Sequence, residues 1–294
     1  PYPEAKALGR SFMLQKRIGM LAEGKAAWMK LVDDDGKLRH TINPLGAISG
    51  RCSSFAPNLQ QVPAVRAEFG AECRDLFTVP AGYDLVGIDL SGIELRLLAH
   101  FMQDGGAYAQ EILTGDIHIA NMHSFGLTDR NQAKSAVYCL IYGGGDAKLG
   151  EVAGKGAAEG RAMKQAFANA NPAFKTLMRK LKQAVEKRGY LIGLDGRKLT
   201  VRGHAHLNLL LQSAAALIAK KWVQLVDQAL KQNNLDAFIV AFVHDEIQVA
   251  TIKGEAENVG NIAVRMAKEA GEFFSIRTPI DAEYGVGKTW RDTH

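Results

Sequence analysis

Four side chains recur at every fourth position in the segment RNQAKSAVYCLIYGGG, which covers residues 130–145. They are Arg130, Lys134, Tyr138 and Tyr142. An α-helix turns about 100° per residue, so positions four apart lie on one slowly winding stripe. Two cations followed by two aromatic rings fit a ligand with phosphates at one end and a flat ring at the other. The stripe therefore indicates a nucleotide-binding helix, although a solvated surface helix would explain the two cations equally well.

The other side of this expected helix is apolar, and its end is marked. Ala133, Ala136, Val137 and Leu140 fall opposite the stripe and predict a surface that faces the core. Three glycines follow at 143–145 and predict the C-terminal end of the helix.

Two aspartates stand at the ends of apolar segments that look like strands. Asp89 lies in YDLVGIDL, residues 83–90, and Asp245 follows DAFIVAFV, residues 236–243. One carboxylate at a strand end is more often a cap or a turn residue. If the two strands are neighbours, like charges about 4 Å apart cost roughly 4 kcal/mol at an effective dielectric near 20, so the pair shares a proton or binds a cation. Carboxylates and phosphates suit Mg²⁺, and two such ions about 3.5–4 Å apart promote in-line phosphoryl transfer.

Glu94 and His118 each admit two interpretations. Ser91 and Glu94 have the spacing of a capping box, in which Glu94 would reach back to a backbone amide. Alternatively, Glu94 lies one helical turn after Asp89 and faces the sugar of a bound nucleotide. His118 is an ordinary loop histidine unless another element brings it close to phosphates.

Asn208 and Gln212 are four residues apart on one face of an expected helix. Two amides on a core helix need hydrogen-bond partners. They could bond to each other or to a loop, or they could contact acceptors in a DNA minor groove, which are similar for all base pairs.

Length and composition indicate an ordinary globular chain. It has 294 residues, of which 47% are hydrophobic and 23% charged, so it can bury a substantial core. The net charge of +5 favours a polyanionic partner. Cys52, Cys73 and Cys139 show no CxxC spacing and indicate reduced thiols in a cytosolic protein. The longest apolar run, 207–219, is too short to span a bilayer, so no membrane partner is expected.

The pattern of apolar residues predicts strands at both ends of a helical block. We expect helices at 11–32, 91–102, 128–142, 171–189 and 207–230. We expect two short strands within 37–51, a polar loop at 53–63, a strand at 83–90, a hairpin at 190–201, and a buried strand at 236–243 that turns at His244, Asp245 and Glu246 into IQVA.

These segments together resemble the family A DNA polymerases, the DNA polymerase I superfamily. DLSGIELR, 89–96, resembles the first family motif, and residues 130–143 match the second without a gap. His244-Asp245-Glu246 resembles the third, and SGRCSSFAPNLQQVP, 49–63, resembles an upstream family loop. Gly92, Tyr138 and YGGGDAKLG resemble the replicative polymerases of short-tailed bacteriophages more than the bacterial repair enzymes.

The resemblance implies an α+β fold, a right-hand polymerase palm with an antiparallel sheet and a helical fingers subdomain. The implied boundaries are a thumb remnant and the start of the palm at 1–36, a first palm segment at 37–92, fingers at 93–202, and a second palm segment at 203–294.

The resemblance also implies roles for individual residues. Asp89 and Asp245 hold two Mg²⁺ ions, for which Mn²⁺ can substitute, and Glu246 lies beside the metals without being a ligand. Arg130, Lys134 and His118 bind the triphosphate, with Lys134 as proton donor to pyrophosphate. Tyr138 and Tyr142 line the base and sugar pocket, and Glu94 excludes a 2′-hydroxyl. Contacts to primer and template are implied for Arg51, His204, Asn208, Gln212 and His244, although many relatives have Arg at position 204.

The implied partners are primer–template DNA, dNTPs and a second chain that would carry a thumb and a 3′–5′ exonuclease, in the cytoplasm of a host cell. Two alternatives stay open. One is a polymerase half, inactive alone, that binds DNA and needs its partner chain. The other is a single-subunit RNA polymerase, which Glu94 and Glu246 disfavour.

Overall fold

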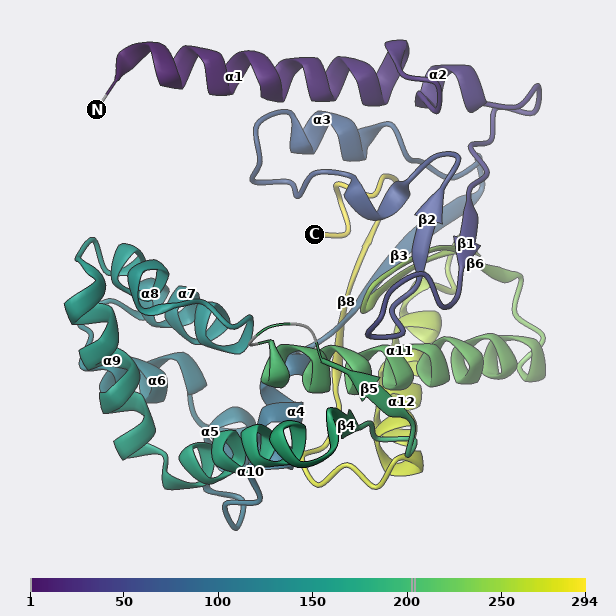
Figure 1. The fold of residues 1–294 in the computed structure, drawn as a ribbon. Coiled ribbons are helices and arrows are strands. Elements are labelled where there is room, and N and C mark those ends of the chain that lie inside the picture. Colours follow the sequence, from purple (N-terminus) through teal and green to yellow (C-terminus); the bar gives the residue numbers. More distant parts are fainter. Residues whose placement is uncertain (1, 202, 204) are drawn as a thin grey trace.

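A four-stranded antiparallel sheet lies at the centre of the computed structural model, which describes residues 2–201, 203 and 205–294 (Figure 1). Its strand order is β6-β7-β3-β8. The strands are β3 (Tyr83–Leu90), β6 (Ala237–Val243), β7 (Glu246–Ile252) and β8 (Ala282–Gly287). β3 pairs with both β7 and β8, so Asp89 stands opposite Glu246 on one side and Glu283 on the other.

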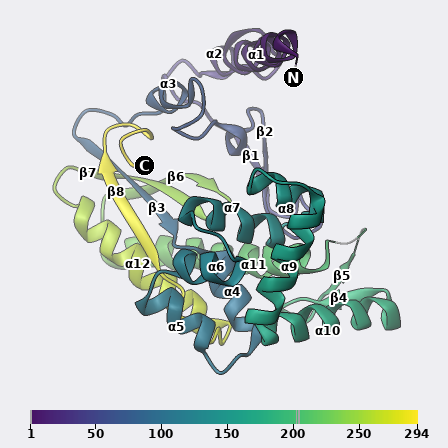
Figure 2. The same ribbon diagram turned by 90° about the vertical axis from the view of Figure 1, so that its left-hand side faces the viewer.

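A block of helices is inserted between β3 and the second half of the sheet, at the left of Figure 1 and facing the viewer in Figure 2. It follows α4 (Ile93–Met102) and contains α5 (Ala107–Thr114), α6 (Ile117–Phe125), α7 (Arg130–Ile141), α8 (Asp146–Val152), α9 (Ala157–Ala170) and α10 (Pro172–Arg188). Asp116 and Asp129 accept backbone N–H groups at the starts of α6 and α7 and so fix where these helices begin. The hairpin of β4 (Tyr190–Ile192) and β5 (Lys198–Thr200) closes the block.

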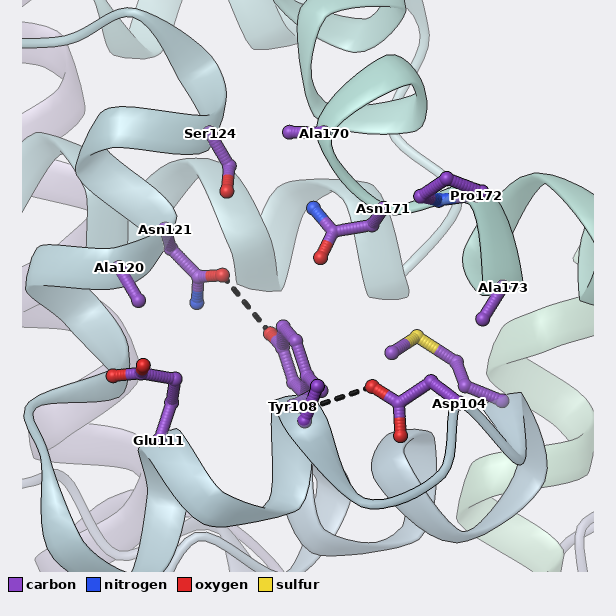
Figure 3. A pocket seen from close by; sticks show the side chains of 12 residues that line it. Asp104, Tyr108, Glu111, Ala120, Asn121, Ser124, Ala170, Asn171, Pro172 and Ala173 are labelled. Carbon is purple, nitrogen blue, oxygen red and sulfur yellow. Dashed lines mark hydrogen bonds between the residues drawn. The ribbon is translucent and has the colours of Figure 1, made fainter.

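A cavity of about 510 Å³ opens inside this block, between α5, α6 and the junction of α9 with α10 (Figure 3). Tyr108 crosses its floor and donates its hydroxyl to Asn121 Oδ1 at 3.0 Å. Asp104, at the rim, accepts the Tyr108 backbone N–H at 2.7 Å and so fixes the start of α5.

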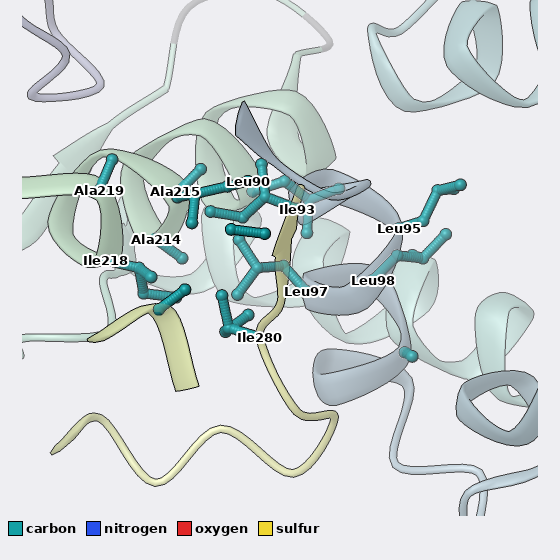
Figure 4. Close-up of a cluster of buried hydrophobic side chains, with 14 of the residues drawn as sticks. Leu90, Ile93, Leu95, Leu97, Leu98, Ala214, Ala215, Ile218, Ala219 and Ile280 are labelled. Carbon is teal, nitrogen blue, oxygen red and sulfur yellow. The ribbon is translucent and has the colours of Figure 1, made fainter. Parts of the chain in front are cut away.

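The main core lies between the sheet and the helices α4, α11 (His206–Gln232) and α12 (Ala256–Phe273). Side chains alternate along a strand, so Val86, Ile88 and Leu90 of β3 all face these helices. Figure 4 shows Leu90 packed with Leu97 of α4 and Ile218 of α11. Asp89 therefore points to the opposite face of the sheet, away from this core.

The N-terminal and C-terminal segments cover part of that opposite face. Leu85 packs there in a smaller cluster with Trp28, Leu59 and Trp290. The N-terminal segment consists of α1 (Pro3–Ile18), the π-helical turn η1 (Gly19–Glu23), α2 (Trp28–Leu31), β1 (Thr41–Asn43), β2 (Ser53–Phe55), the 3₁₀ turn η2 (Leu59–Gln61) and α3 (Gly70–Asp75). Most of α1 stands apart from the rest of the fold (Figures 1 and 2).

Most expected elements are confirmed, but the N-terminal third was predicted less well. The expected helix at 11–32 is wrong at its start and in its continuity, since α1 begins at Pro3 and the chain is extended at Gly24 before α2. The second strand expected within 37–51 is also wrong: β1 pairs with β2 at 53–55, inside the predicted loop. Residues 44–52 instead form the connection between the two strands.

Two further expectations need correction. β6 is an edge strand and not a buried one, because Phe238 and Val240 are 52% and 50% exposed. A run of apolar residues has the same composition in a buried central strand and in an edge strand, so the sequence alone did not distinguish the two. α11 is long and apolar enough, by composition, to cross a membrane, but 56% of its most apolar window is buried. Its apolar residues therefore serve the core.

Leu97→Ala should test the core that supports Asp89. Leu97 is fully buried, and its truncation should leave a cavity between α4 and the sheet, which lowers the free energy of unfolding by about 2–5 kcal/mol. Leu113→Ala, at a position 44% exposed, is the matched control and should cost less than about 1 kcal/mol. If urea unfolding showed the same loss in free energy of unfolding for both variants, this description of the core would be contradicted.

Candidate active site

Asp89 and Asp245 meet at the end of the β3–β7 pair. Asp245 lies in the tight turn between β6 and β7, and its carbonyl accepts the backbone N–H of Leu90 at 3.0 Å. His244 precedes it with a positive φ of 60°, which turns the chain sharply enough to bring Asp245 beside β3. The two predicted metal-binding acids are therefore neighbours, as their positions after apolar segments suggested.

The ionisation of both aspartates is perturbed. Loss of hydration around the Asp89 carboxyl, together with the charges of Asp245, Glu246 and Glu94, raises its pKa to about 8. Burial and the charge of Glu94 raise the pKa of Asp245 to about 6, against an opposing effect of Arg51. Crowded carboxylates of this kind hold a proton unless a cation replaces it.

Glu246, next to Asp245 in sequence and opposite Asp89 in the β3–β7 register, is bonded to side chains of β7 and of the C-terminal segment. Its carboxylate accepts Gln248 Nε2 at 2.7 Å, contacts His294 Nε2 at 3.0 Å and accepts the indole N–H of Trp290. Although burial alone would raise the pKa of Glu246, these partners lower it overall. That Glu246 lies beside the metals without being a ligand stays a prediction.

The acids fit hard cations that keep other oxygen ligands. Within the described ranges, no three His, Cys, Asp or Glu side chains are grouped as a closed metal cage. Mg²⁺ does not need one, because it binds through one or two carboxylates and takes its remaining oxygens from water and substrate phosphates. Two aspartates with raised pKa values suit that mode of binding.

The stripe on α7 has the form that its spacing predicted. Ala133, Ala136 and Val137 are fully buried, while Arg130 and Lys134 are exposed. Arg130 Nε donates to Asp116 Oδ2 at 2.7 Å, so the cap of α6 also fixes this cation. The partly buried Asp116 was not among the predicted site residues, because its role depends on a contact between two helices.

His118 belongs to the first turn of α6 and not to a loop. Burial, followed by the charges of Lys134 and Arg130, lowers the pKa of the His118 imidazole. Asp116 accepts both the His118 backbone N–H and Arg130 Nε, so the start of α6 lies beside the start of α7. The residues expected to bind a triphosphate thus come from two adjoining helix starts.

Glu94 is not the capping-box residue that its spacing allowed. Gly92, with a positive φ of 57°, is the N-cap of α4, and no side chain caps this end. Glu94 is only 7% exposed and instead accepts hydrogen bonds from Arg51 Nη2 and from the Tyr142 hydroxyl, both at 3.1 Å. It thereby links α4 and Arg51 to the end of α7.

Tyr138 and Tyr142 stack with ring centroids 6.3 Å apart. Burial and the charge of Glu94 raise the pKa of each tyrosine to about 12, so both hydroxyls keep their protons. The charges of Asp245 and Asp89 contribute further to the raised pKa of Tyr138. The aromatic end of the stripe is joined to Glu94 by the Tyr142 hydroxyl.

The residues expected to contact DNA are less closely assembled. Asn208 and Gln212 lie near the start of α11, and no bond joins them among the hydrogen bonds of the described residues. His244 lies at the β6–β7 turn, where partial loss of hydration and the Arg51 charge lower the pKa of its imidazole. His204 lies outside the described residues. Arg51, for which a primer or template contact was implied, bonds to Glu94.

One acid of the site escaped sequence reasoning. Glu283 stands opposite Asp89 in the β3–β8 register and adds negative charge there. The cavity of Figure 3 contains none of the predicted site residues, so it is separate from this centre.

Comparison with known proteins extends over nearly the whole chain. Residues 21–292 match the sequence family described as DNA polymerase family A. The DNA-directed DNA polymerases of Enterobacteria phage T3 and Escherichia phage T7 are each 39% identical, across 96% of this chain and 45% of their own length. DNA polymerase I of Bacillus caldotenax is 30% identical, across 90% of this chain and 32% of its own. The chain thus spans less than half of these relatives.

A solved structure is similar throughout the fold. It is the POL domain of Pol1 from M. smegmatis in complex with DNA primer-template and dNTP, with a TM-score of 0.81 and 28% identity. The similarity covers 90% of this chain and 50% of that one. The expected α+β polymerase fold and the resemblance to phage and bacterial enzymes are thereby confirmed.

The pKa of Asp89 predicts a pH-dependent stability in the absence of metal. In the unfolded chain its carboxyl ionises near pH 3.8, but in the folded protein it holds its proton up to about pH 8. The folded state therefore binds the extra proton between these values, and the free energy of unfolding should fall as the pH rises through them. Asp89→Asn should flatten this slope and be more stable than the wild type at pH 8.

Urea unfolding in EDTA, at a series of pH values, measures the effect. Asp227→Asn is the control, since Asp227 is an exposed acid whose partner is Lys231 at 2.6 Å. A slope in Asp89→Asn as steep as in the wild type would show that other groups cause it.

Proposed function

The chain belongs to DNA polymerase family A, and on that premise we propose that it catalyses template-directed DNA synthesis. In this reaction the 3′-hydroxyl of a primer attacks the α-phosphorus of a dNTP, a new P–O bond forms and the bond to pyrophosphate breaks. The proposed substrates are primer–template DNA and dNTPs, with Mg²⁺ as cofactor and Mn²⁺ as a substitute. The molecules bound in the similar M. smegmatis structure support this choice.

One observation carries the proposal. Asp89 and Asp245 meet at the end of the β3–β7 pair with raised pKa values, and Glu94, one turn after Asp89, accepts a hydrogen bond at 3.1 Å from Tyr142 at the aromatic end of the α7 stripe. A cation site next to a surface for phosphates and a flat ring suits nucleotidyl transfer more than it suits binding of DNA alone.

Each group has a task that follows from its place. Asp89 and Asp245 would hold the two metal ions, which supply Lewis-acid stabilisation of the reacting oxygens. Arg130 and His118 would bind the triphosphate, after Arg130 exchanges Asp116 for phosphate oxygens. Lys134, exposed one turn further along α7, would give a proton to the departing pyrophosphate, while the proton of the 3′-hydroxyl is lost to water.

Selection of the nucleotide would depend on Glu94 and the two tyrosines. Glu94 is held by Arg51 and Tyr142, so its carboxylate presents a fixed edge where a 2′-hydroxyl would lie. Tyr138 and Tyr142 would line the base and sugar pocket. Primer and template would be contacted by Arg51, His204, Asn208, Gln212 and His244.

We assign the four segments accordingly: a thumb remnant and the start of the palm at 1–36, palm at 37–92, fingers at 93–202, and palm again at 203–294. The central sheet and the inserted helical block support the division between palm and fingers. The phage and bacterial sources of the relatives support action in the cytoplasm of a host cell.

A second candidate function is that of a polymerase half which needs a partner chain with a thumb and a 3′–5′ exonuclease. Helix α1 favours it, because Leu8 and Phe12 on one face are 56% and 60% exposed. Primer extension with and without an added upstream segment separates the two candidates. A single-subunit RNA polymerase is disfavoured by Glu94 at the sugar position and by Glu246.

Asp89→Ala and Asp245→Ala should each abolish primer extension with Mg²⁺ or Mn²⁺. Losing one side of a metal clamp removes several kcal/mol of transition-state stabilisation, so kcat should fall by about a thousandfold or more. Asp227→Ala removes an exposed acid outside the site and should leave extension unchanged. Near-normal extension by either site variant would exclude the metal assignment.

Tyr138→Phe should make the enzyme discriminate against dideoxynucleotides. A normal dNTP can satisfy its own phosphate oxygen with its 3′-hydroxyl, and the Tyr138 hydroxyl would replace that donor when a dideoxynucleotide binds. An unpaired buried acceptor costs about 1–3 kcal/mol, which corresponds to roughly 10–100-fold discrimination. The ratio of kcat/KM for the two substrates measures it. The same ratio in wild type and variant would mean that Tyr138 does not face the sugar.

A further inference from the structure

Arg51, which fixes Glu94, follows a connection that has no regular secondary structure. Residues 44–50 join β1 to Arg51 and β2. Within this loop, Gly50 N–H donates to Ala47 O at 2.8 Å, and Ala47 N–H donates back to Arg51 O at 3.2 Å. Two short backbone bonds do not by themselves fix the direction of a long side chain. The loop therefore needs support from another element.

Lys220, near the middle of α11, supplies that support. Its ammonium donates to the carbonyl oxygens of Gly50, at 2.6 Å, and of Pro44. These two carbonyls lie at opposite ends of the loop, so one cation joins its entry to its exit. Hydrogen bonds from a charged donor are roughly twice as strong as neutral ones.

Arg197, in the β4–β5 hairpin, also contacts this loop. Its Nη2 donates to Ser213 Oγ at 3.1 Å and, more weakly, to Ser49 O at 3.4 Å. Gly50 has a φ of 81°, and a Cβ there would lie 2.6 Å from the Arg197 guanidinium. The loop is thus confined between α11 and the hairpin immediately before Arg51.

We propose that Lys220 is a positioning residue that sets the choice between deoxyribo- and ribonucleotides. It holds the 44–50 loop, the loop directs Arg51, and Arg51 holds the Glu94 carboxylate at 3.1 Å. Lys220 touches neither Glu94 nor either metal-binding acid. The inference rests on the proposed polymerase function and on Glu94 facing the sugar.

The first arm of the test measures the loop without any activity. Lys220→Met keeps most of the apolar stem and removes the ammonium. Hydrogen exchange of peptides covering 44–51 should become faster in this variant by about fivefold or more, for a lost contact near 1 kcal/mol. Lys221→Met is the matched control, because the Lys221 ammonium donates to Gln224, at 3.3 Å, and lies over Phe273. Unchanged exchange at 44–51 in Lys220→Met would overturn the proposal.

The second arm measures selectivity between dNTPs and ribonucleotides in primer extension. The upstream segment is added if the wild type needs it for activity. The ratio of kcat/KM for dNTPs to kcat/KM for ribonucleotides should fall by about fivefold in Lys220→Met, stay unchanged in Lys221→Met, and recover in Lys220→Arg. If Lys220 acts through Arg51, Lys220→Met should add nothing in an Arg51→Ala background. The positioning role would be overturned if Lys220→Met lowered the selectivity ratio by a further fivefold in the Arg51→Ala background. It would also be overturned if Lys220→Met lowered kcat/KM equally for dNTPs and ribonucleotides.

The two arms separate this inference from the proposed function. A wild type that extends primers while Lys220→Met keeps its selectivity removes only the role of Lys220. If the wild type extends no primer, with or without the added upstream segment, the polymerase function is excluded. The selectivity role of Lys220 is then excluded with it.

Discussion

The repulsion between carboxylates at the end of the β3–β7 pair is the interaction around which the rest of the site is arranged. Strand register brings Asp89 beside Asp245, Glu246 and Glu283, and Glu94 follows within one turn of α4. Concentrated negative charge destabilises a folded chain unless each acid has a partner or a proton. Glu246 has Trp290, His294 and Gln248, and Glu94 has Arg51 and Tyr142. Asp89, Asp245 and Glu283 have no bonded cation among the ion pairs of the described residues, so the uncompensated negative charge is concentrated at this end of the sheet.

The need to give partners to some of these acids explains why segments distant in sequence meet at the site. The C-terminal Trp290 and His294 satisfy Glu246, the N-terminal Arg51 satisfies Glu94, and α7 supplies Tyr142 from the inserted block. Each contact removes one acid from competition for a cation. On the proposed metal assignment, the fold selects the cation-binding position mainly by giving partners to the acids that are not ligands.

Periodicity predicted the parts of the site that lie within one element, and missed those that depend on contacts between elements. The α7 stripe and its buried face follow from spacing alone, and Asp89 with Asp245 could be paired because both end apolar strands. Asp116 could not be assigned to Arg130, since the bond joins two helices. Glu283 could not be placed, because neighbours in a sheet are not set by composition. For Glu94 the local sequence was misleading. Its spacing from Ser91 allowed a capping box, but its carboxylate bonds to Arg51 and Tyr142 from distant segments.

The edge strand β6 has a consequence for how the protein behaves in concentrated solution. An exposed edge with apolar residues such as Phe238 offers unpaired backbone groups to other chains and invites aggregation. The register of β6 shifts between Ile239 and Ala241, which leaves Val240 outside the ladder. Such a bulge bends and twists the strand, so a second copy cannot align along its whole length. The irregularity at Val240 thus acts as a local safeguard against edge-to-edge polymerisation of the chain.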